Sequence, residues 1–192
     1  MRIVGGKFKG HNIAPPHGSA TRPTTDRVRE SVFNILAHGI DGLEVEGARV
    51  LDLFAGTGAM GLEAVSRGAR FCQFVEDSAE ARGLIRKNAD ALGVIGLVKI
   101  WRRDATDLGS CVPQPRFDLV FADPPYGKGL GEKALKSLIA GDWLNAGGIV
   151  VLEEHQKAEV KDIAGLALID ERDYGETRIR FYRRGRHEDQ EA

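Results

Sequence analysis

Short apolar runs alternate with amphipathic segments over residues 49–153, and few architectures accommodate this pattern. The apolar runs are typical of strands buried on both faces, whereas the segments between them repeat apolar residues at helical spacing. The expected strands are residues 49–54, 71–75, 97–101, 117–122 and 149–153, and the expected helices are residues 59–67, 79–92 and a helix marked by 134–139. Repeated strand–helix units of this length predict an α/β fold with a doubly wound, mostly parallel sheet and helices on both faces.

The two ends of the chain differ from this alternating region. Residues 166–169 and 177–182 predict a terminal antiparallel pair of strands. Near the start, two short arms flank a pair of glycines where a β-hairpin could turn, and a helix then runs to about residue 38 from an N-cap at Thr24 or Thr25. The predicted parts are a hairpin extension and linker over residues 1–20, the main domain over residues 21–185 and a disordered tail over residues 186–192.

Charge is unevenly distributed along the chain. The formal net charge is −1, but residues 1–29 hold six Lys or Arg residues and one Asp, a local charge of +5 that leaves −6 for the remainder. A basic arm on a mildly acidic body predicts a polyanionic partner. The candidates for phosphate contacts are Lys7, Lys9, Arg22 and Arg27.

Composition excludes several classes of protein. With 42% hydrophobic and 29% charged residues, the chain is typical of a globular protein. No apolar run approaches the roughly 20 residues of a membrane helix, and the N-terminus lacks a signal-peptide core, so we expect a cytoplasmic protein without a membrane partner. Cys72 and Cys111 lack the spacing of a disulfide framework or a zinc site, and no metal site is predicted.

The apolar run at residues 117–122 stops abruptly in Asp123, Pro124, Pro125 and Tyr126. Proline has no backbone N–H, so this loop can present carbonyl oxygens and the Asp123 carboxylate but almost no donors. Such a surface favours a ligand that donates. An exocyclic amine fits, because Asp123 and the Pro124 carbonyl could receive its two N–H bonds while Tyr126 stacks on the attached ring. For this tetrapeptide alone, an ordinary turn that closes a strand is the alternative.

A second motif follows the first expected strand. Gly56, Gly58 and Gly61 satisfy the G-x-G-x-x-G spacing of dinucleotide-binding folds, and Glu76 ends the next strand about 20 residues on. NAD-dependent oxidoreduction is therefore an alternative. Two features favour S-adenosylmethionine instead. A carboxylate at Asp52 would repel a pyrophosphate but suits a cationic amino group or sulfonium, and a nicotinamide enzyme has no need of an acceptor-only loop.

Each end of S-adenosylmethionine then has an expected partner. Glu76 can receive the ribose diol, Asp104 the adenine amine, and the backbone at residues 56–58 the amino acid end. In an open α/β sheet, ligands bind at the carboxyl ends of the strands, where these groups and Asp123 should converge. The candidate cofactor-binding residues are Asp52, Phe54, Ala55, Gly56, Thr57, Gly58, Glu76, Asp77, Asp104, Ala105 and Asp123.

These motifs resemble those of the class I S-adenosylmethionine-dependent methyltransferases. The class resemblance is carried by residues 51–58, Glu76, Asp104 and residues 123–126. A narrower resemblance, to the RsmD-like guanine-N2 methyltransferases of bacterial 16S ribosomal RNA, is carried by residues 1–6, 21–30, 33–34 and 174–177. Together the matching residues span almost the whole chain.

The resemblance implies a Rossmann-like sheet of seven strands with the last strand antiparallel, and S-adenosylmethionine as cofactor. It also implies methylation of the exocyclic N2 amine of a guanine in 16S ribosomal RNA, within an assembling small subunit. Two further alternatives remain. An N6-adenine DNA methyltransferase would use a similar acidic or amide Pro-Pro-aromatic loop, and a non-catalytic RNA-binding assembly factor could retain the fold.

Overall fold

The computed structural model describes residues 1–15 and 25–185. The predicted phosphate contact at Arg22, the N-cap candidate Thr24, the end of the predicted linker and the predicted tail over residues 186–192 lie outside the described residues.

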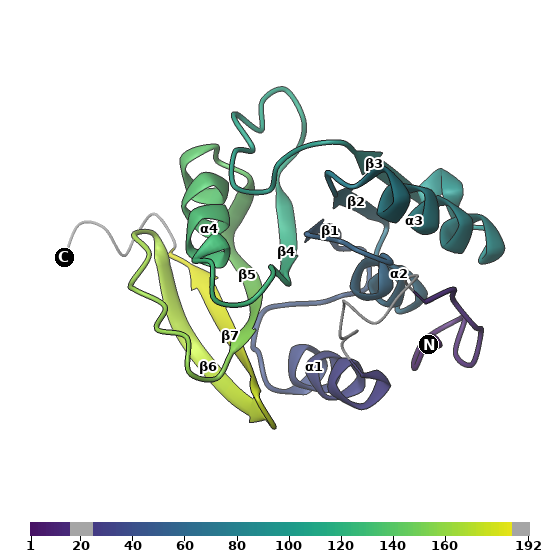
Figure 1. The fold of residues 1–192 in the computed structure, drawn as a ribbon, viewed down its shortest axis with the longest axis horizontal. Helices are drawn as coiled ribbons and strands as arrows, with labels where there is room; N and C mark the ends of the chain where they lie inside the picture. The colour runs from purple at the N-terminus through teal and green to yellow at the C-terminus, as the bar shows by residue number, and fades with distance from the viewer. Residues whose placement is uncertain (16–24, 186–192) are drawn as a thin grey trace.

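The core of the fold is one seven-stranded sheet in the order β3-β2-β1-β4-β5-β7-β6 (Figure 1). The strands are β1 (Arg49–Leu53), β2 (Phe71–Val75), β3 (Val98–Trp101), β4 (Phe117–Ala122), β5 (Leu144–His155), β6 (Leu166–Tyr174) and β7 (Thr177–Arg184). Strands β1 to β5 are parallel to one another, and β7 lies antiparallel between β5 and β6. The predicted α/β class, the seven strands and the antiparallel last strand are confirmed.

Within the described residues, four α-helices cover the sheet, namely α1 (Asp26–His38), α2 (Ala59–Ser66), α3 (Ala79–Ala91) and α4 (Leu130–Ala140). A 3₁₀ turn at Ile95–Leu97 leads into β3. The predicted caps are found: the Thr25 hydroxyl accepts from the backbone N–H of Val28, and the Ser78 hydroxyl accepts from that of Ala81. Strand β5 begins five residues before the expected start at residue 149, because Leu144 already pairs with Phe117 on β4.

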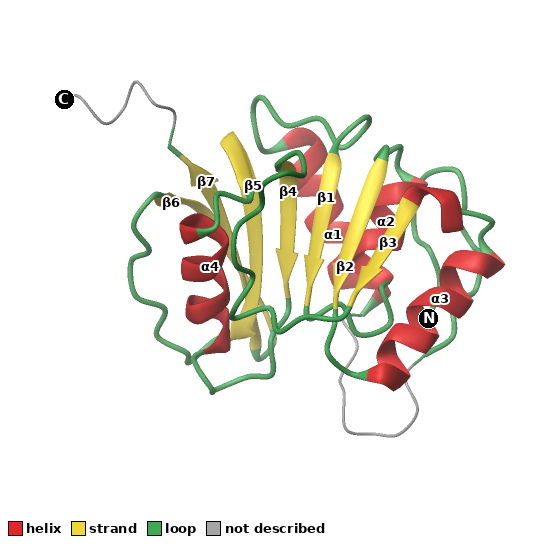
Figure 2. Cartoon of the chain, turned by 90° about the horizontal axis from the view of Figure 1, so that it is seen from above, coloured by secondary structure: helices red, strands yellow, loops and turns green. Residues whose placement is uncertain are grey.

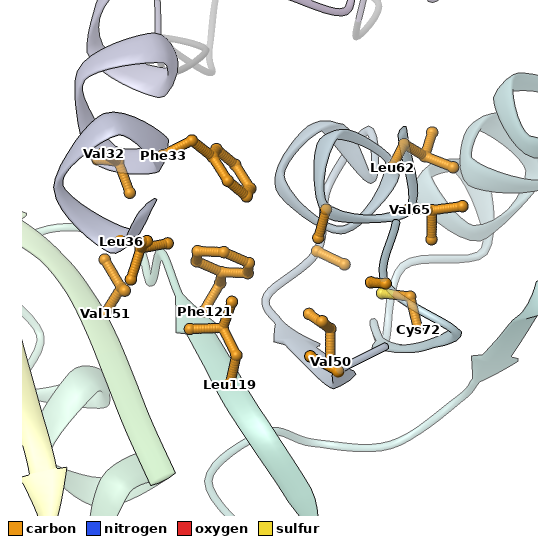
Figure 3. Packing of buried hydrophobic residues seen from close by; sticks show 14 of the residues in the cluster. Val32, Phe33, Leu36, Val50, Leu62, Val65, Cys72, Leu119, Phe121 and Val151 are labelled. Atoms are coloured by element: carbon orange, nitrogen blue, oxygen red, sulfur yellow. The ribbon is translucent and has the colours of Figure 1, made fainter. Parts of the chain in front are cut away.

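Two apolar layers hold the helices against opposite faces of the sheet (Figure 2). On one face, Phe33 and Leu36 of α1 meet Phe121 of β4 and Val151 of β5, beside α2 and α3 (Figure 3). The Phe33 and Phe121 rings lie 5.5 Å apart between centroids. The other face packs α4 against the sheet around the fully buried Trp143. Helix α4 therefore covers one face of the sheet, and α1, α2 and α3 cover the other.

The predicted N-terminal β-hairpin takes a reduced form. A single antiparallel bridge joins Arg2 to Asn12, and the chain between them turns without forming strands. The Gly5 carbonyl, which a longer ladder would pair with Lys9, accepts instead from the hydroxyl of Ser66 in α2. The backbone N–H groups of Lys7 and Phe8, at the turn, donate to the carbonyl and the hydroxyl of Ser66. Pairing therefore stops at the Arg2–Asn12 bridge, because the next carbonyl of the ladder is bonded to α2.

The N-terminal segment also contributes to the main core. Ile3 and Ile13 are buried in the same apolar cluster as α1 and α2. Residues 1–15 thus pack as part of the layer that covers this face of the sheet. Among the described helices, none has the length and apolar character that crossing a membrane requires.

Candidate active site

The carboxyl ends of the parallel strands form a single edge on which the site residues lie in a row. Leu53 of β1 pairs with Val75 of β2 on one side and with Ala122 of β4 on the other, and Ala122 pairs with Leu152 of β5. The residues that come one position later are therefore neighbours along the edge, and they are Glu76, Phe54, Asp123 and Glu153. The convergence predicted for the glycine loop, Glu76 and Asp123 is present.

The glycine loop between β1 and α2 has a backbone that few residues adopt. Phe54, Gly56 and Gly58 have φ angles of 56°, 53° and 76°. For Phe54 this conformation is strained, and strain of this kind is concentrated at ligand-binding sites. A Cβ added at Gly56 would meet only the carbonyl oxygen of Phe54, at 3.9 Å, so the space in front of Gly56 is open to a ligand.

Glu76 fixes this loop from the end of β2. Its Oε2 accepts from the backbone N–H of Gly56 at 3.0 Å, and its Oε1 accepts from that of Ser78 at 2.9 Å. A carboxylate can accept about four hydrogen bonds. Glu76 therefore holds the loop and retains the capacity to receive a pair of hydroxyl groups.

Asp52 lies deeper than the sequence argument assumed. The side chain is 3% exposed, and its Oδ2 accepts from the backbone N–H of Gly61 in α2 at 2.9 Å. Burial raises the pKa of Asp52 to about 8; repulsion from Glu76 adds to this, and the bond from Gly61 opposes it. The prediction of a charged Asp52 that repels a pyrophosphate is not supported, because the neutral carboxyl is favoured at pH 7.

Three predicted cofactor contacts lie on the loops after β2 and β3. Asp104 is exposed, and its Oδ1 accepts from the hydroxyl of Thr106 at 2.7 Å and from its backbone N–H at 2.8 Å. These two bonds hold the pKa of Asp104 below its usual value, so the carboxylate is charged at the surface. Ala105 is buried behind it, and the exposed Asp77 receives Arg82 at its backbone carbonyl.

The acceptor loop follows β4 as the sequence predicts. Asp123 is half-buried and its backbone N–H donates to the Leu53 carbonyl at 3.5 Å, which ties this loop to the end of β1. Pro124 is buried, and Pro125 is exposed. The acceptor loop thus starts beside the glycine loop, with the Asp123 residue lining the depression described below.

Tyr126 is held at its hydroxyl group. The hydroxyl donates to Glu153 Oε1 at 2.8 Å and lies 2.9 Å from the Thr177 hydroxyl. The ring meets His155 edge-on with 5.9 Å between centroids. Burial raises the pKa of Tyr126 above its ordinary value, and the Glu153 carboxylate adds to this effect, so the phenol stays protonated.

A narrow depression opens beside Asp123 on the face that carries α1 and α2. Its volume is about 10 Å³, roughly the room of one water molecule. It is lined by Val32, Met60, Phe121, Ala122, Asp123, Val151, Glu153 and Ile179. Sequence reasoning missed Glu153 here: the residue stands at the end of an expected strand, but only the strand order places it next to Asp123.

Comparison with known proteins agrees with this geometry. Residues 1–183 match the family described as Conserved hypothetical protein 95. The chain belongs to this family. Ribosomal RNA small subunit methyltransferase D of Escherichia coli is 35% identical over 96% of this chain and 90% of its own length. The predicted resemblance to RsmD-like methyltransferases is thereby confirmed.

Two further similarities are informative. The solved structure of yhhF from Escherichia coli superposes with a TM-score of 0.82 and 32% identity, over 96% of this chain and 98% of that one. A tRNA (guanine(6)-N2)-methyltransferase of Thermus thermophilus is 39% identical over 45% of this chain and 26% of its own length. The chain therefore has the same fold as yhhF over almost its whole length. Its sequence similarity to the Thermus thermophilus enzyme is limited to a shorter region.

In this family member, the N-terminal segment reaches the glycine loop through a residue that the sequence did not single out. Asn88 of α3 is buried, and its amide donates to the Thr57 carbonyl at 3.0 Å and to the Ala14 carbonyl at 3.3 Å. Its Oδ1 accepts from the Ala14 backbone N–H at 2.8 Å. Asn88 thus joins the N-terminal segment to the glycine loop through hydrogen bonds.

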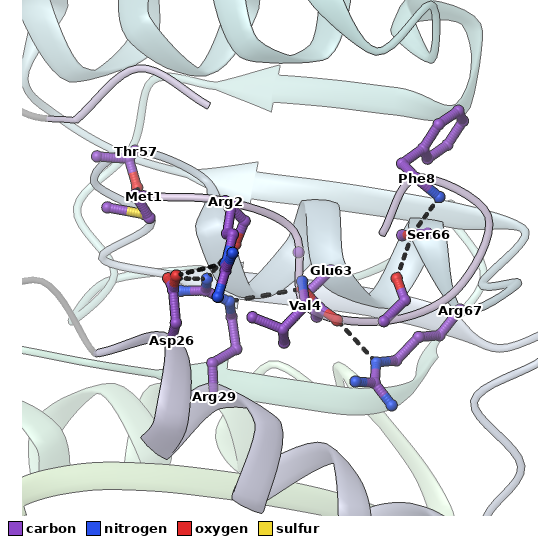
Figure 4. A network of polar contacts seen from close by, with 12 residues as sticks. Met1, Arg2, Val4, Phe8, Asp26, Arg29, Thr57, Glu63, Ser66 and Arg67 are labelled. Atoms are coloured by element: carbon purple, nitrogen blue, oxygen red, sulfur yellow. Dashed lines mark hydrogen bonds and ion pairs between the residues drawn. The ribbon is translucent and has the colours of Figure 1, made fainter. Parts of the chain in front are cut away.

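A buried ion network joins the same segment to α1 and α2 (Figure 4). Glu63 is fully buried between Arg29, at 3.5 Å, and Arg67, at 2.8 Å, and it also accepts from the Val4 backbone N–H. Arg29 further pairs with Asp26. Arg29 is therefore buried and adds no charge to the basic surface of the N-terminal region. The predicted phosphate contacts Lys7, Lys9 and Arg27 are exposed.

No cluster of three or more His, Cys, Asp or Glu side chains suited to a metal ion occurs within residues 1–15 and 25–185.

Proposed function

We propose that the protein methylates the exocyclic N2 amine of a guanine in 16S ribosomal RNA, in the cytoplasm and within an assembling small subunit, with S-adenosylmethionine as methyl donor. Methyl transfer to ribosomal RNA is the activity in the name of its full-length relative. The observation that carries the proposal is the register of β1 and β4, which sets the acceptor loop directly beside the glycine loop. The guanine N2 target is supported by the name of the shorter Thermus relative.

The cofactor residues suit the chemistry of their proposed ligand. The open space at Gly56 and the left-handed backbone at Gly58 would receive the amino acid end, Glu76 the ribose diol and Asp104 the adenine amine. Bound there, S-adenosylmethionine supplies an electrophilic methyl group on a cationic sulfonium. Asp52 would not contact the cofactor; its carboxyl group accepts from the backbone N–H of Gly61 in α2, the helix that follows the glycine loop.

The acceptor loop acts on the nucleophile. The N2 lone pair of guanine is delocalised into the ring and is a poor nucleophile. Acceptance of its two N–H bonds by Asp123 and the Pro124 carbonyl favours a pyramidal nitrogen with the lone pair freed. Positive charge grows on this nitrogen as the new bond forms, so the Asp123 carboxylate stabilises the transition state more than the ground state. No strong general base is required, since the proton leaves only after the nitrogen has become cationic.

Alignment supplies the rest of the rate enhancement. Holding two reactants in a reactive geometry contributes roughly 7–11 kcal/mol to lowering a barrier of this kind. Tyr126, whose hydroxyl is fixed by Glu153 and Thr177, offers its ring for stacking on a base that has left its RNA stack. Such a stacking contact is worth about 1–3 kcal/mol.

The decisive experiment follows the methyl group. Tritiated S-adenosylmethionine is incubated with 16S ribosomal RNA, bare and bound to ribosomal proteins, and the label is mapped and identified as a nucleoside. We expect N2-methylguanosine at one position. A parallel incubation with DNA that yields N6-methyladenine would support the DNA methyltransferase alternative, and absence of transfer to any of these substrates would support the assembly factor.

Asp123→Ala tests the role of the acceptor loop. We expect turnover to fall by at least about 10³-fold, because one donor–acceptor bond and the stabilising charge are lost together. Affinity for S-adenosylmethionine, measured by calorimetry, should stay within about twofold, as it should in the control Asp90→Ala on the exposed end of α3. A near-normal rate in Asp123→Ala would remove Asp123 from the chemistry.

A further inference from the structure

Two carboxylates stand side by side at the edge of the sheet. Asp123 and Glu153 each come one position after a registered pair, Ala122 of β4 and Leu152 of β5. Side chains alternate along a strand, so both carboxylates belong to the face of Phe121 and Val151, which is the face covered by α1. Both line the same depression beside α1 and α2.

The surroundings of this pair are apolar and fixed. The other side chains of the depression are hydrocarbon or aromatic, apart from Met60 with its thioether. Glu153 is half-buried and receives the Tyr126 hydroxyl at Oε1, while Tyr126 also contacts Thr177 on β7. One oxygen of Glu153 is therefore oriented by the protein, and a carboxylate can accept about four hydrogen bonds.

A flat ring laid across this depression would meet two acceptors with one edge. Guanine offers adjacent donors there, the N1–H and the N2 amine, whereas adenine offers an amine beside an unprotonated N1 that is itself an acceptor. The depression of about 10 Å³ does not enclose a purine, so the ring would lie over its mouth. An adenine N1 would then face a carboxylate without a proton between them.

We propose that Glu153 is the residue that selects guanine, by accepting its N1–H while Asp123 and the Pro124 carbonyl receive the N2 amine. This inference rests on the proposed function and names the group that sets its base specificity. Sites built to receive a particular N–H strongly reject analogues that lack it, because a buried polar group is left unpaired. Tyr126 acts through Glu153 as a positioning residue.

The probe for the N1 proton is 2-aminopurine. This base keeps the amine at position 2 but has an unprotonated N1 and no oxygen at position 6, so the effect of N1 is read from how Glu153 variants change the preference. We compare methylation of 16S ribosomal RNA carrying guanine or 2-aminopurine at the mapped position, prepared by ligation of a synthetic segment. For the wild-type protein we expect guanine to be preferred by at least about 10²-fold in kcat/KM.

Glu153→Gln should lower the ratio of kcat/KM for guanine to that for 2-aminopurine. The glutamine amide can donate to the N1 of 2-aminopurine, and its oxygen can still accept from guanine. We expect the ratio of the two rates to fall by at least about tenfold, with cofactor affinity and melting temperature unchanged. Glu159→Gln, an exposed residue outside the depression, should leave the ratio at the wild-type value. Tyr126→Phe, which keeps the ring but removes the hydroxyl that donates to Glu153, should lower this ratio by a smaller factor.

The outcomes separate this inference from the function on which it rests. If the wild-type protein forms N2-methylguanosine but methylates 2-aminopurine equally well, the role of Glu153 is overturned and the proposed function stands. The same conclusion follows if neither Glu153→Gln nor Tyr126→Phe changes the ratio. If the wild-type protein forms no N2-methylguanosine, the proposed function fails, and the selection by Glu153 fails with it.

Discussion

Asp52 and Glu76 have different roles because their side chains differ in burial. Asp52 and Glu76 lie at the ends of neighbouring strands, but Asp52 is buried against α2 whereas Glu76 reaches the backbone of the glycine loop. Burial disfavours the charged form of a carboxyl group. Asp52 therefore serves as a largely neutral support for α2, and Glu76 remains the candidate for direct contact with the cofactor.

Asp52 should make stability depend on pH. Its pKa rises from 3.8 to about 8 on folding, so between these values the folded protein retains a proton that the unfolded chain has released. This stabilising contribution is fully present below about pH 4 and is lost as the pH rises through about 8. Urea unfolding at pH 5 and pH 8 should show a larger loss of unfolding free energy in the wild type than in Asp52→Asn. An identical loss in both proteins would contradict the raised pKa; the exposed Asp90→Asn should match the wild type.

Glu76→Ala should weaken binding of S-adenosylmethionine by at least about tenfold, measured by calorimetry. The change removes the proposed acceptor for the ribose diol and also releases the backbone N–H groups of Gly56 and Ser78. Glu80→Ala, exposed in the first turn of α3, is the matched control and should bind normally. Wild-type affinity in Glu76→Ala would place the cofactor elsewhere.

Among the elements, α2 shows how closely a helix must approach the sheet to build this site. A Cβ at Gly61 would lie 2.5 Å from the Cys72 sulfur and even closer to the Phe74 ring, both on β2. The same glycine donates its N–H to Asp52. The third glycine of the motif is thus required for helix–sheet packing, and the open space for a ligand is at Gly56.

Two glycine-to-alanine changes should have opposite effects on stability. Gly61→Ala forces the helix or the Phe74 ring to move and should lower the unfolding free energy by about 1–3 kcal/mol. Gly83→Ala, in α3 with no atom within 4 Å of the new Cβ, should raise it by up to about 1 kcal/mol through helix propensity. Denaturant unfolding of both variants tests this pair. A harmless Gly61→Ala would mean that α2 lies further from the sheet.

Across the whole molecule, the basic N-terminal segment and the cofactor loop form one connected unit. Asn88 joins Ala14 to Thr57, and the Glu63 network anchors the segment to α1 and α2. The exposed Lys7 and Lys9 therefore lie on a segment that is hydrogen-bonded, through Asn88, to the glycine loop. Contacts with RNA are proposed to use this surface together with Arg27.

RNA affinity should consequently fall with salt. Three phosphate contacts, at about 0.7 released ions each for single strands, give a slope of roughly −2 in a plot of log affinity against log salt. The double change Lys7→Ala with Lys9→Ala should reduce the size of this slope by about 1.4. Lys136→Ala, on α4 at the opposite face of the sheet, should leave it unchanged. An affinity independent of salt would rule out this surface.

The sequence by itself determined which segments become strands and helices, but the ends of β5 and β6 differ from the expected ones. Those features depend on local periodicity, on caps such as Thr25 and Ser78, and on the two prolines after β4. The parallel sheet then brings strand ends to one edge, which is why the convergence of Glu76 with Asp123 could be predicted.

Only the tertiary structure decided which strands are neighbours and which protonation state the burial of Asp52 favours. The order of β4 and β5 places Glu153 next to Asp123, burial neutralises Asp52, and bonds to α2 reduce the hairpin to one bridge. Each of these results depends on contacts between residues far apart in the chain. Local patterns carry no information about such contacts, because strand order and solvent exposure are properties of the packed molecule.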